Sequence, residues 1–397
     1  MNTVVPESVG VSSSRLARLG RCMEAYIDRG DFAGLVVLIA RHGAVCYLET
    51  FGQMDIEAQK PMAVDTIFRI YSMSKPITTV AALTLYEQGR FQLTTPVSEF
   101  IPAFKDLQVL RSFTETDIEF EPLAREMTVR DLMTHTSGLT YGFDDSSPIE
   151  EMYRQHIHGD KFLRRSLQET MALLADLPLV HQPGTAWRYS VSTDVLGYIV
   201  EAASGMPLGS FLQQQVFEPL GMQDTGFFVP PDRIDRLAAN YAPEPDGSLR
   251  LVDAPSTGIY SRPPRLESGG GGLASTIGDY FQFAQMLLNG GTWGGERILS
   301  RKTIELAMMN HLTPEMLPSY QNPGFGFGLG GKVLMDPAQA QIVGSPGLFG
   351  WGGAATTDFW IDPTEQLVGV IMPQLMDGGE YPLQADFQVL VYQALDD

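Results

Sequence analysis

Two strand-turn-strand patterns, one near each end of the chain, limit most strongly what this sequence can fold into. Residues 34–40 and 44–51 are rich in apolar, β-branched and aromatic residues and flank a short turn that contains Gly43. Residues 356–361 and 367–372 flank a second turn in the same way. Strands do not alternate with helices as they do in a doubly wound parallel sheet. We therefore predict an antiparallel sheet that is built from both ends of the chain.

Helical patterns flank the two hairpins and dominate the residues between them. Apolar residues recur at helical spacing over residues 14–29 and 386–395. The expected helices of the middle region cover residues 77–88, 129–134, 167–176, 193–203 and 208–216. A chain of 397 residues is longer than one hydrophobic core usually supports. We predict an α+β fold in which residues 1–85 and 265–397 form a sheet domain and residues 86–264 form a mainly helical inserted domain.

The excess of acidic residues argues against several classes of partner. The chain has 47 Asp and Glu residues against 27 Lys and Arg residues, which gives a formal net charge of −20. This charge repels phosphate backbones and anionic lipids, so we expect no nucleic-acid partner and no membrane partner. The first residues lack a signal-peptide pattern, and Cys22 and Cys46 lack the spacing of a disulfide framework. We expect a cytoplasmic enzyme with two buried thiols, and the sequence does not indicate its oligomeric state.

A serine and a lysine three residues apart are the first candidates for chemistry. They are Ser72 and Lys75, and we expect Ser72 to open the helix that follows. A serine hydroxyl is a poor nucleophile until a base takes its proton, and side chains three residues apart on a helix share one face. The start of a helix also directs free backbone N–H groups at a developing oxyanion. Alone, the pattern is short, and a helix-capping serine followed by a surface lysine is the more common explanation.

Three further segments make the pattern specific. They lie at residues 131–139, which contain His-Thr-Ser-Gly, at residues 183–190, which end in Tyr189-Ser190, and at residues 350–353, Gly-Trp-Gly-Gly. With these segments the sequence resembles the serine β-lactamase and penicillin-binding-protein superfamily over nearly its whole length. Within that superfamily it resembles the class C β-lactamase-like esterases, known as family VIII carboxylesterases. The resemblance implies a β-lactamase-like fold with the active site at the interface of the two domains.

The resemblance also implies roles for individual residues. Ser72 corresponds to the acylated nucleophile, and Lys75 and Tyr189 correspond to the groups that take and return its proton. The oxyanion is expected between the backbone N–H groups of Ser72 and Ala354. No cofactor is expected. The implied activity is that of a serine hydrolase acting on carboxylic esters.

Two departures from the β-lactamase pattern narrow the expected substrate. Val191 stands where the family's Tyr-x-Asn element has Asn, and Trp351-Gly352-Gly353 stands where β-lactamases have Lys-Thr-Gly. The side-chain amide and the cation that hold a β-lactam are therefore missing. We expect a small or short-acyl uncharged ester, bound by Trp351, Gly352, Gly353 and the nearby Phe349. An acyltransferase, a weak β-lactamase and a non-catalytic penicillin-binding-like module remain as alternatives.

Other motifs are interpreted as structural. Gly-x-Ser-x-Gly does not occur, which argues against an α/β-hydrolase, and His135 is interpreted as a structural histidine of its turn. His156 and His158 lack a third ligand at metal spacing, so we expect no metal. Residues 326–331 match Gly-x-Gly-x-x-Gly but do not open a helix, and we predict a glycine-rich strand there instead of a nucleotide site.

Overall fold

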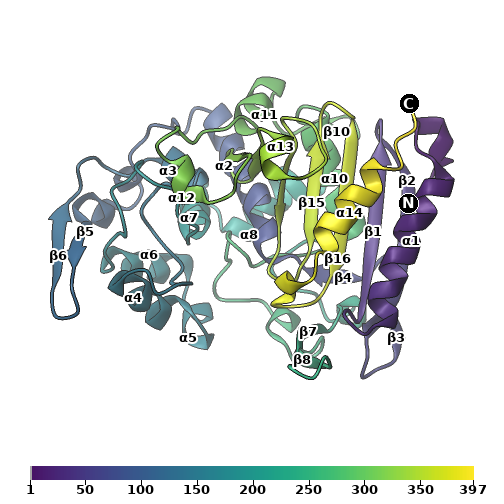
Figure 1. Ribbon diagram of the computed structural model, residues 1–397. Helices are drawn as coiled ribbons and strands as arrows, with labels where there is room; N and C mark the ends of the chain where they lie inside the picture. Colours follow the sequence, from purple (N-terminus) through teal and green to yellow (C-terminus); the bar gives the residue numbers. More distant parts are fainter. Residues whose placement is uncertain (1) are drawn as a thin grey trace.

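One antiparallel sheet organises the protein, whose computed structural model describes residues 2–397 (Figure 1). Its eight strands lie in the order β12-β13-β14-β15-β16-β1-β2-β3. They are β1 (Gly34–Arg41), β2 (Ala44–Asp55), β3 (Lys60–Pro61), β12 (Phe325–Phe327), β13 (Lys332–Leu334), β14 (Phe349–Gly352), β15 (Asp358–Asp362) and β16 (Leu367–Pro373). β1 pairs with β16 from Leu35↔Pro373 to Arg41↔Leu367. The two ends of the chain therefore meet within one sheet, as the sequence predicts.

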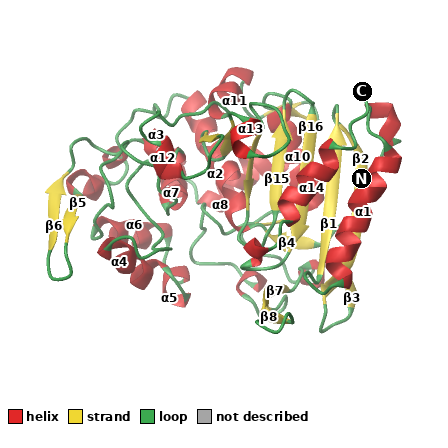
Figure 2. Ribbon diagram, viewed as in Figure 1, coloured by secondary structure: helices red, strands yellow, loops and turns green. Residues whose placement is uncertain are grey.

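Helices cover both faces of this sheet and form most of the remaining structure. They are α1 (Ser13–Asp28), α2 (Ser74–Glu87), α3 (Val129–Met133), α4 (Pro148–Ile157), α5 (Asp160–Leu163), α6 (Leu167–Ala175), α7 (Ser192–Ser204), α8 (Leu208–Leu212), α9 (Glu218–Leu220), α10 (Ile277–Leu288), α11 (Arg301–Ala307), α12 (Leu317–Tyr320), α13 (Pro337–Ala340) and α14 (Leu383–Tyr392). Figure 2 shows the sheet between the terminal helices and the helices of the middle region.

Alternate residues of β1 face opposite sides of the sheet. Leu35 and Val37 belong to a hydrophobic cluster that includes residues of α1 and α14. Val36 and Leu38 belong to a second cluster, which includes residues of α10 and α2. Because both faces are covered, the whole strand is buried, which explains why residues 34–40 are apolar without interruption. α1 and α14 lie next to each other on the first face, close to both chain ends (Figure 1).

The middle of the chain lies on the side of the molecule opposite the termini. Its helices continue the cluster that contains α2, and α2 packs directly against α7. Short two-stranded ladders complete the structure: β4 (Ile67–Arg69) with β9 (Ala274–Thr276), β5 (Gln108–Phe113) with β6 (Ile118–Pro122), β7 (Asn240–Pro243) with β8 (Leu249–Asp253), and β10 (Thr292–Trp293) with β11 (Glu296–Arg297). The β5–β6 hairpin projects at the left of Figure 1. The proposed domain boundaries stay a prediction.

Two sequence-based expectations about local structure are wrong. Only Phe325–Phe327 of the expected glycine-rich strand is a strand, because the chain then turns into β13. The turn is closed by a 2.8 Å hydrogen bond from Gly328 N to Gly331 O, and Gly330 has a φ of 84° that favours glycine. The helix expected at residues 208–216 is interrupted, since a π-helical turn at Gln213–Phe217 separates α8 from α9.

The buried carboxyl group of Asp358, in β15, should make the free energy of unfolding depend on pH. The side chain of Asp358 is buried, and burial raises its pKa to about 6 while Lys332 lowers it in part. The protonated carboxyl stabilises the fold below about pH 4, and this contribution is lost as the pH rises through about 6. We expect Asp358→Asn to increase the free energy of unfolding by up to about 3 kcal/mol above pH 6.5, and much less at pH 4.

Urea unfolding of both proteins at pH 4, 5.5 and 7.5 measures this difference. Asp176→Asn is a matched control because Asp176 is exposed at the end of α6. Its effect at pH 7.5 should be much smaller than that of Asp358→Asn. The prediction would be contradicted if Asp358→Asn changed the free energy of unfolding, relative to the unaltered protein, by the same amount at all three pH values.

Candidate active site

The predicted nucleophile lies in a tight turn that precedes α2. Tyr71–Met73 form one 3-10 turn and α2 begins at Ser74, so Ser72 does not itself open the α-helix as expected. Tyr71 has a φ of 42°, which is uncommon for a residue other than glycine and occurs where surrounding contacts hold the backbone. The Tyr71 hydroxyl accepts a 3.0 Å hydrogen bond from Asn240 Nδ2. The backbone before Ser72 is therefore held in a sparsely populated conformation.

The structure brings Ser72, Lys75 and Tyr189 together. Lys75 Nζ lies 3.3 Å from Ser72 Oγ, and Tyr189 OH lies 2.6 Å from the same oxygen. Lys75 is only 1% exposed, and its Nζ lies 4.5 Å from the centre of the Tyr189 ring. Tyr189 reaches this position from the loop that precedes α7, which packs against α2. Residues far apart in sequence thus converge on one hydroxyl oxygen.

Lys75 has two further hydrogen-bond acceptors. Its Nζ donates to Gly270 O at 2.6 Å and to Tyr141 OH at 3.2 Å, in addition to Ser72 Oγ. The three acceptors surround the nitrogen at 2.6 to 3.3 Å. The lysine side chain is therefore fixed in place before any substrate binds.

Tyr141 and Asp194 are site residues that the sequence reasoning missed. Asp194, in α7, is 2% exposed and accepts hydrogen bonds from Ser268 Oγ at 2.5 Å and from Gly270 N at 3.2 Å. Burial raises the pKa of Asp194, while the Ser268 hydroxyl and the charge of Lys75 oppose this shift. Burial and the nearby charge of Asp194 hold the pKa of Tyr141 well above its usual value. Tyr141 therefore remains a neutral phenol between Lys75 and a buried carboxylate.

His135 packs against Tyr189. It is 1% exposed, its Nδ1 lies 3.1 Å from Ser190 Oγ, and its ring centre lies 5.1 Å from that of Tyr189. Burial and the nearby charge of Lys75 hold the pKa of His135 well below its usual value, so the imidazole is neutral. The ring of Trp187 stacks on Tyr189 at 6.1 Å. Both side chains support Tyr189, which agrees with the structural interpretation of His135.

Strand β14 borders the site opposite α7. The ring centre of Trp351 lies 5.6 Å from that of Tyr189. A Cβ atom on Gly353 would lie 2.5 Å from Ile70 O and 2.2 Å from Thr357 Oγ1, so only glycine lets the Ser72 turn approach this segment so closely. Gly353 N donates to Thr357 O at 2.7 Å, and Ala354 follows directly. The expected oxyanion role of Ser72 and Ala354 stays a prediction.

The other residues of the expected binding segment differ in accessibility. Phe349 is 3% exposed and lies in the hydrophobic core, against Gly331. Trp351 and Gly352 are partly exposed. Val191, at the position of the family's Asn, is fully buried before α7. A substrate wall formed by Phe349 therefore stays a prediction, and Trp351 offers more surface.

Comparison with known proteins identifies the family. A family model described as Beta-lactamase matches residues 19–393. The chain belongs to the beta-lactamase family. It is 36% identical to Protein Rv1367c of Mycobacterium tuberculosis, with 86% of this chain and 85% of that protein covered. It is 31% identical to Esterase EstB of Burkholderia gladioli, with 88% of each chain covered.

One solved structure has the same fold. It is described as "EstCE1, a hydrolase with promiscuous acyltransferase activity", and it matches with a TM-score of 0.81 and 30% identity over 96% of this chain and 98% of that one. The predicted α+β, β-lactamase-like fold and the membership of its esterase group are confirmed. These relatives support serine-hydrolase-type activity for this beta-lactamase-family chain.

The contact between Tyr141 and Lys75 predicts that the Tyr141 hydroxyl group contributes measurably to catalysis. We expect Tyr141→Phe to lower kcat for ester hydrolysis by about 10- to 100-fold, because Lys75 loses a hydrogen-bonding partner. Steady-state kinetics from pH 6 to 10 measure the loss. Tyr198→Phe, in the apolar helix α7, is the matched control and should retain full activity. Equal kcat values for Tyr141→Phe and the unaltered protein would contradict this role.

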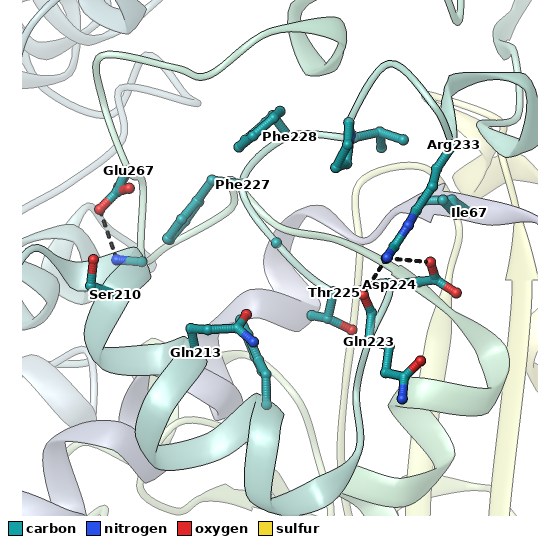
Figure 3. Close-up of a pocket in the computed structure, with 15 residues that line it drawn as sticks. Ile67, Ser210, Gln213, Gln223, Asp224, Thr225, Phe227, Phe228, Arg233 and Glu267 are labelled. Carbon is teal, nitrogen blue, oxygen red and sulfur yellow. Dashed lines mark hydrogen bonds and ion pairs between the residues drawn. The ribbon is translucent and has the colours of Figure 1, made fainter.

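A cavity of about 370 Å³ lies away from Ser72, between α8 and residues 223–233 (Figure 3). Its charged groups already have partners in the protein. Arg233 binds Asp224 at 3.0 Å, and Glu267 accepts a 2.7 Å hydrogen bond from Gly209 N. Nothing in its lining singles out a ligand.

The described part of the chain contains neither a metal-binding cluster nor a single helix that could span a membrane. Within residues 2–397, no group of three or more His, Cys, Asp and Glu side chains is arranged to hold a metal ion. No single helix in the same range is long and apolar enough to cross a membrane. Two segments bent by 76°, Ser192–Ser204 and Leu208–Leu220, meet the length and composition criteria only as a pair.

Proposed function

We propose that this protein is a serine carboxylesterase that hydrolyses small or short-acyl esters through an acyl-enzyme on Ser72. The observation that carries the proposal is the position of the Ser72 hydroxyl, which is in hydrogen-bond contact with both Tyr189 OH and Lys75 Nζ. A nucleophile needs such a neighbouring base to react at neutral pH. The similarity to a protein named Esterase EstB and to the hydrolase EstCE1 supports the same reaction.

Acylation begins with attack of Ser72 Oγ on the ester carbonyl carbon. As the new C–O bond forms, the Ser72 proton passes to the Tyr189–Lys75 pair. The carbonyl oxygen becomes an oxyanion that the backbone N–H groups of Ser72 and Ala354 stabilise. Collapse of this intermediate breaks the bond to the alcohol, which leaves with the proton held by the pair. The acyl group remains on Ser72.

Deacylation repeats these steps with water as the nucleophile. The Tyr189–Lys75 pair takes a proton from water as the water oxygen attacks the acyl carbon. Collapse of the second tetrahedral intermediate releases the carboxylic acid and returns a proton to Ser72 Oγ. Tyr141 and Gly270 hold Lys75 in place through both halves of the cycle, and the protein returns to its starting state.

An uncharged ester suits the site better than a β-lactam does. Trp351 stands where β-lactamases have a lysine, and the buried Val191 offers no side-chain amide. A β-lactam carboxylate bound beside Trp351 would lack its usual cation. We therefore expect cephalosporin opening to be at least about 100-fold slower than ester hydrolysis.

Acyl transfer to an alcohol is the second candidate reaction. Trp351, Trp187 and Tyr189 form an aromatic border beside Ser72, and such a surface favours an alcohol over water as the acyl acceptor. The hydrolase EstCE1 is described with promiscuous acyltransferase activity. Adding an alcohol during ester turnover and measuring the ratio of new ester to free acid separates the two reactions.

Labelling with a serine-reactive phosphonate tests the proposal directly. Intact-protein mass spectrometry should find one adduct on the unaltered protein and none on Ser72→Ala. Ser74→Ala, two residues away, is the matched control and should still be labelled. Failure of the unaltered protein to react would favour the non-catalytic penicillin-binding-like module.

A further inference from the structure

A large aromatic side chain is exposed beside the proposed catalytic residues. Phe143 is 64% exposed, whereas most phenylalanines in folded proteins are buried. Its ring stacks on that of Tyr141, with centres 4.9 Å apart and planes 19° apart. It also lies 6.3 Å from the ring of Tyr189. Phe143 therefore packs beside Tyr141 and Tyr189. The Tyr141 hydroxyl group binds Lys75, and the Tyr189 hydroxyl group binds Ser72.

The loop that carries Phe143 is held in place by two arginines. Arg154 donates to the backbone carbonyl groups on both sides of Phe143, to Gly142 O at 3.0 Å and to Asp144 O at 2.7 Å. Arg188 binds the Asp144 carboxylate at 2.8 Å. Arg188 also binds the fully buried Glu150, which ties the loop to the segment that carries Tyr189. Phe143 is thus fixed in its exposed position before any ligand binds.

A preformed, exposed aromatic face has a definite preference for ligands. It binds flat apolar groups by stacking and by removing apolar surface from water, with little loss of conformational entropy. The two arginines that hold its loop, Arg154 and Arg188, are already paired with carboxylates. Neither is available to bind an acidic substituent without losing those bonds.

We propose that Phe143 determines specificity by binding an aromatic group of the ester substrate. This inference rests on the proposed esterase function and names the substrate class: small esters with a phenyl-like group, in the acyl or the alcohol part, near the ester bond. The phenyl group stacks on Phe143 while the ester carbonyl lies at Ser72. The ring adds binding energy without contacting the reacting atoms.

Paired esters that differ by one phenyl group test the proposal. The acyl arm compares ethyl acetate with ethyl 3-phenylpropanoate, and the alcohol arm compares ethyl acetate with 2-phenylethyl acetate, all by pH-stat titration. We expect Phe143→Ala to lower kcat/KM by about 10-fold for the phenyl ester of one arm, mainly through KM, and to leave ethyl acetate within about two-fold. The arm that responds identifies which part of the ester contacts Phe143.

Three controls separate the possible outcomes. Phe113→Ala removes another exposed phenylalanine, on the β5–β6 hairpin, and should change none of the rates. Phe143→Tyr keeps an aromatic ring and should retain the preference, whereas Phe143→Leu should lose most of it. Equal losses for ethyl acetate and both phenyl esters, or no loss for either phenyl ester, would overturn the proposal. If the unaltered protein hydrolyses none of the esters, the proposed function itself fails.

Discussion

Ser72→Ala is expected to lower kcat/KM for p-nitrophenyl acetate by about 10⁴-fold or more, the largest effect of any single substitution in this chain. The substitution removes the oxygen that forms the acyl bond, so no covalent intermediate can accumulate. Rapid mixing should detect a burst of p-nitrophenol with the unaltered protein if deacylation is the slower step, and none with Ser72→Ala. The residual rate should equal that of an attack by water on a bound ester.

The neighbouring serine is the appropriate comparison. Ser74 is fully buried, and its Oγ accepts a 3.1 Å hydrogen bond from Leu273 N instead of facing Lys75. Ser74→Ala should therefore affect stability more than turnover. Thermal unfolding of both variants checks that each is folded. A folded Ser72→Ala protein with unchanged turnover would show that another residue is the nucleophile.

The sequence allowed the sheet and the grouping of Ser72, Lys75 and Tyr189 to be predicted, because each depends on a strong local or family signal. Residues 34–40 of β1 and the whole of β16 are apolar, and both strands are buried in the interior of the sheet. Ser72 and Lys75 are only three residues apart in sequence, so their contact needs no more than the 3-10 turn that leads into α2. Tyr189 is distant in sequence, and only the resemblance to a known family connected it with them.

The contacts of Tyr141 and Asp194 could not be predicted in the same way. Asp194 lies in an apolar stretch of α7, where a buried carboxylate needs partners, and this is the one signal that the sequence contains. Its partners come from the glycine-rich segment at residues 268–270, and nothing local indicates that this segment lies beside α7. The left-handed backbone at Tyr71 was also unpredictable, because the contact with Asn240 comes from β7.

Substitutions in the proposed proton-transfer pair, Tyr189 and Lys75, should have the second-largest effect on kcat. They also say more about the mechanism than Ser72→Ala does. We expect Tyr189→Phe and Lys75→Met each to lower kcat by about 10²- to 10⁴-fold, because each removes a group in contact with Ser72 Oγ. Since Lys75 Nζ also lies over the Tyr189 ring, the two side chains should act as one unit. The double variant should then lose little more activity than the more damaged single variant.

A double-mutant cycle distinguishes this coupled pair from two independent groups. Independent groups would give a double variant whose loss is the product of the two single losses, about 10⁴- to 10⁸-fold in total and so about 10²- to 10⁴-fold beyond either single variant. Lys75→Met also leaves the buried Asp194 without a nearby cation, so its thermal stability must be measured alongside its activity. Restoring activity at higher pH in Lys75→Met but not in Tyr189→Phe would assign the essential base to Tyr189, because a phenolate can then form without the lysine. The reverse pattern would assign it to Lys75, with Tyr189 holding the Ser72 hydroxyl in position.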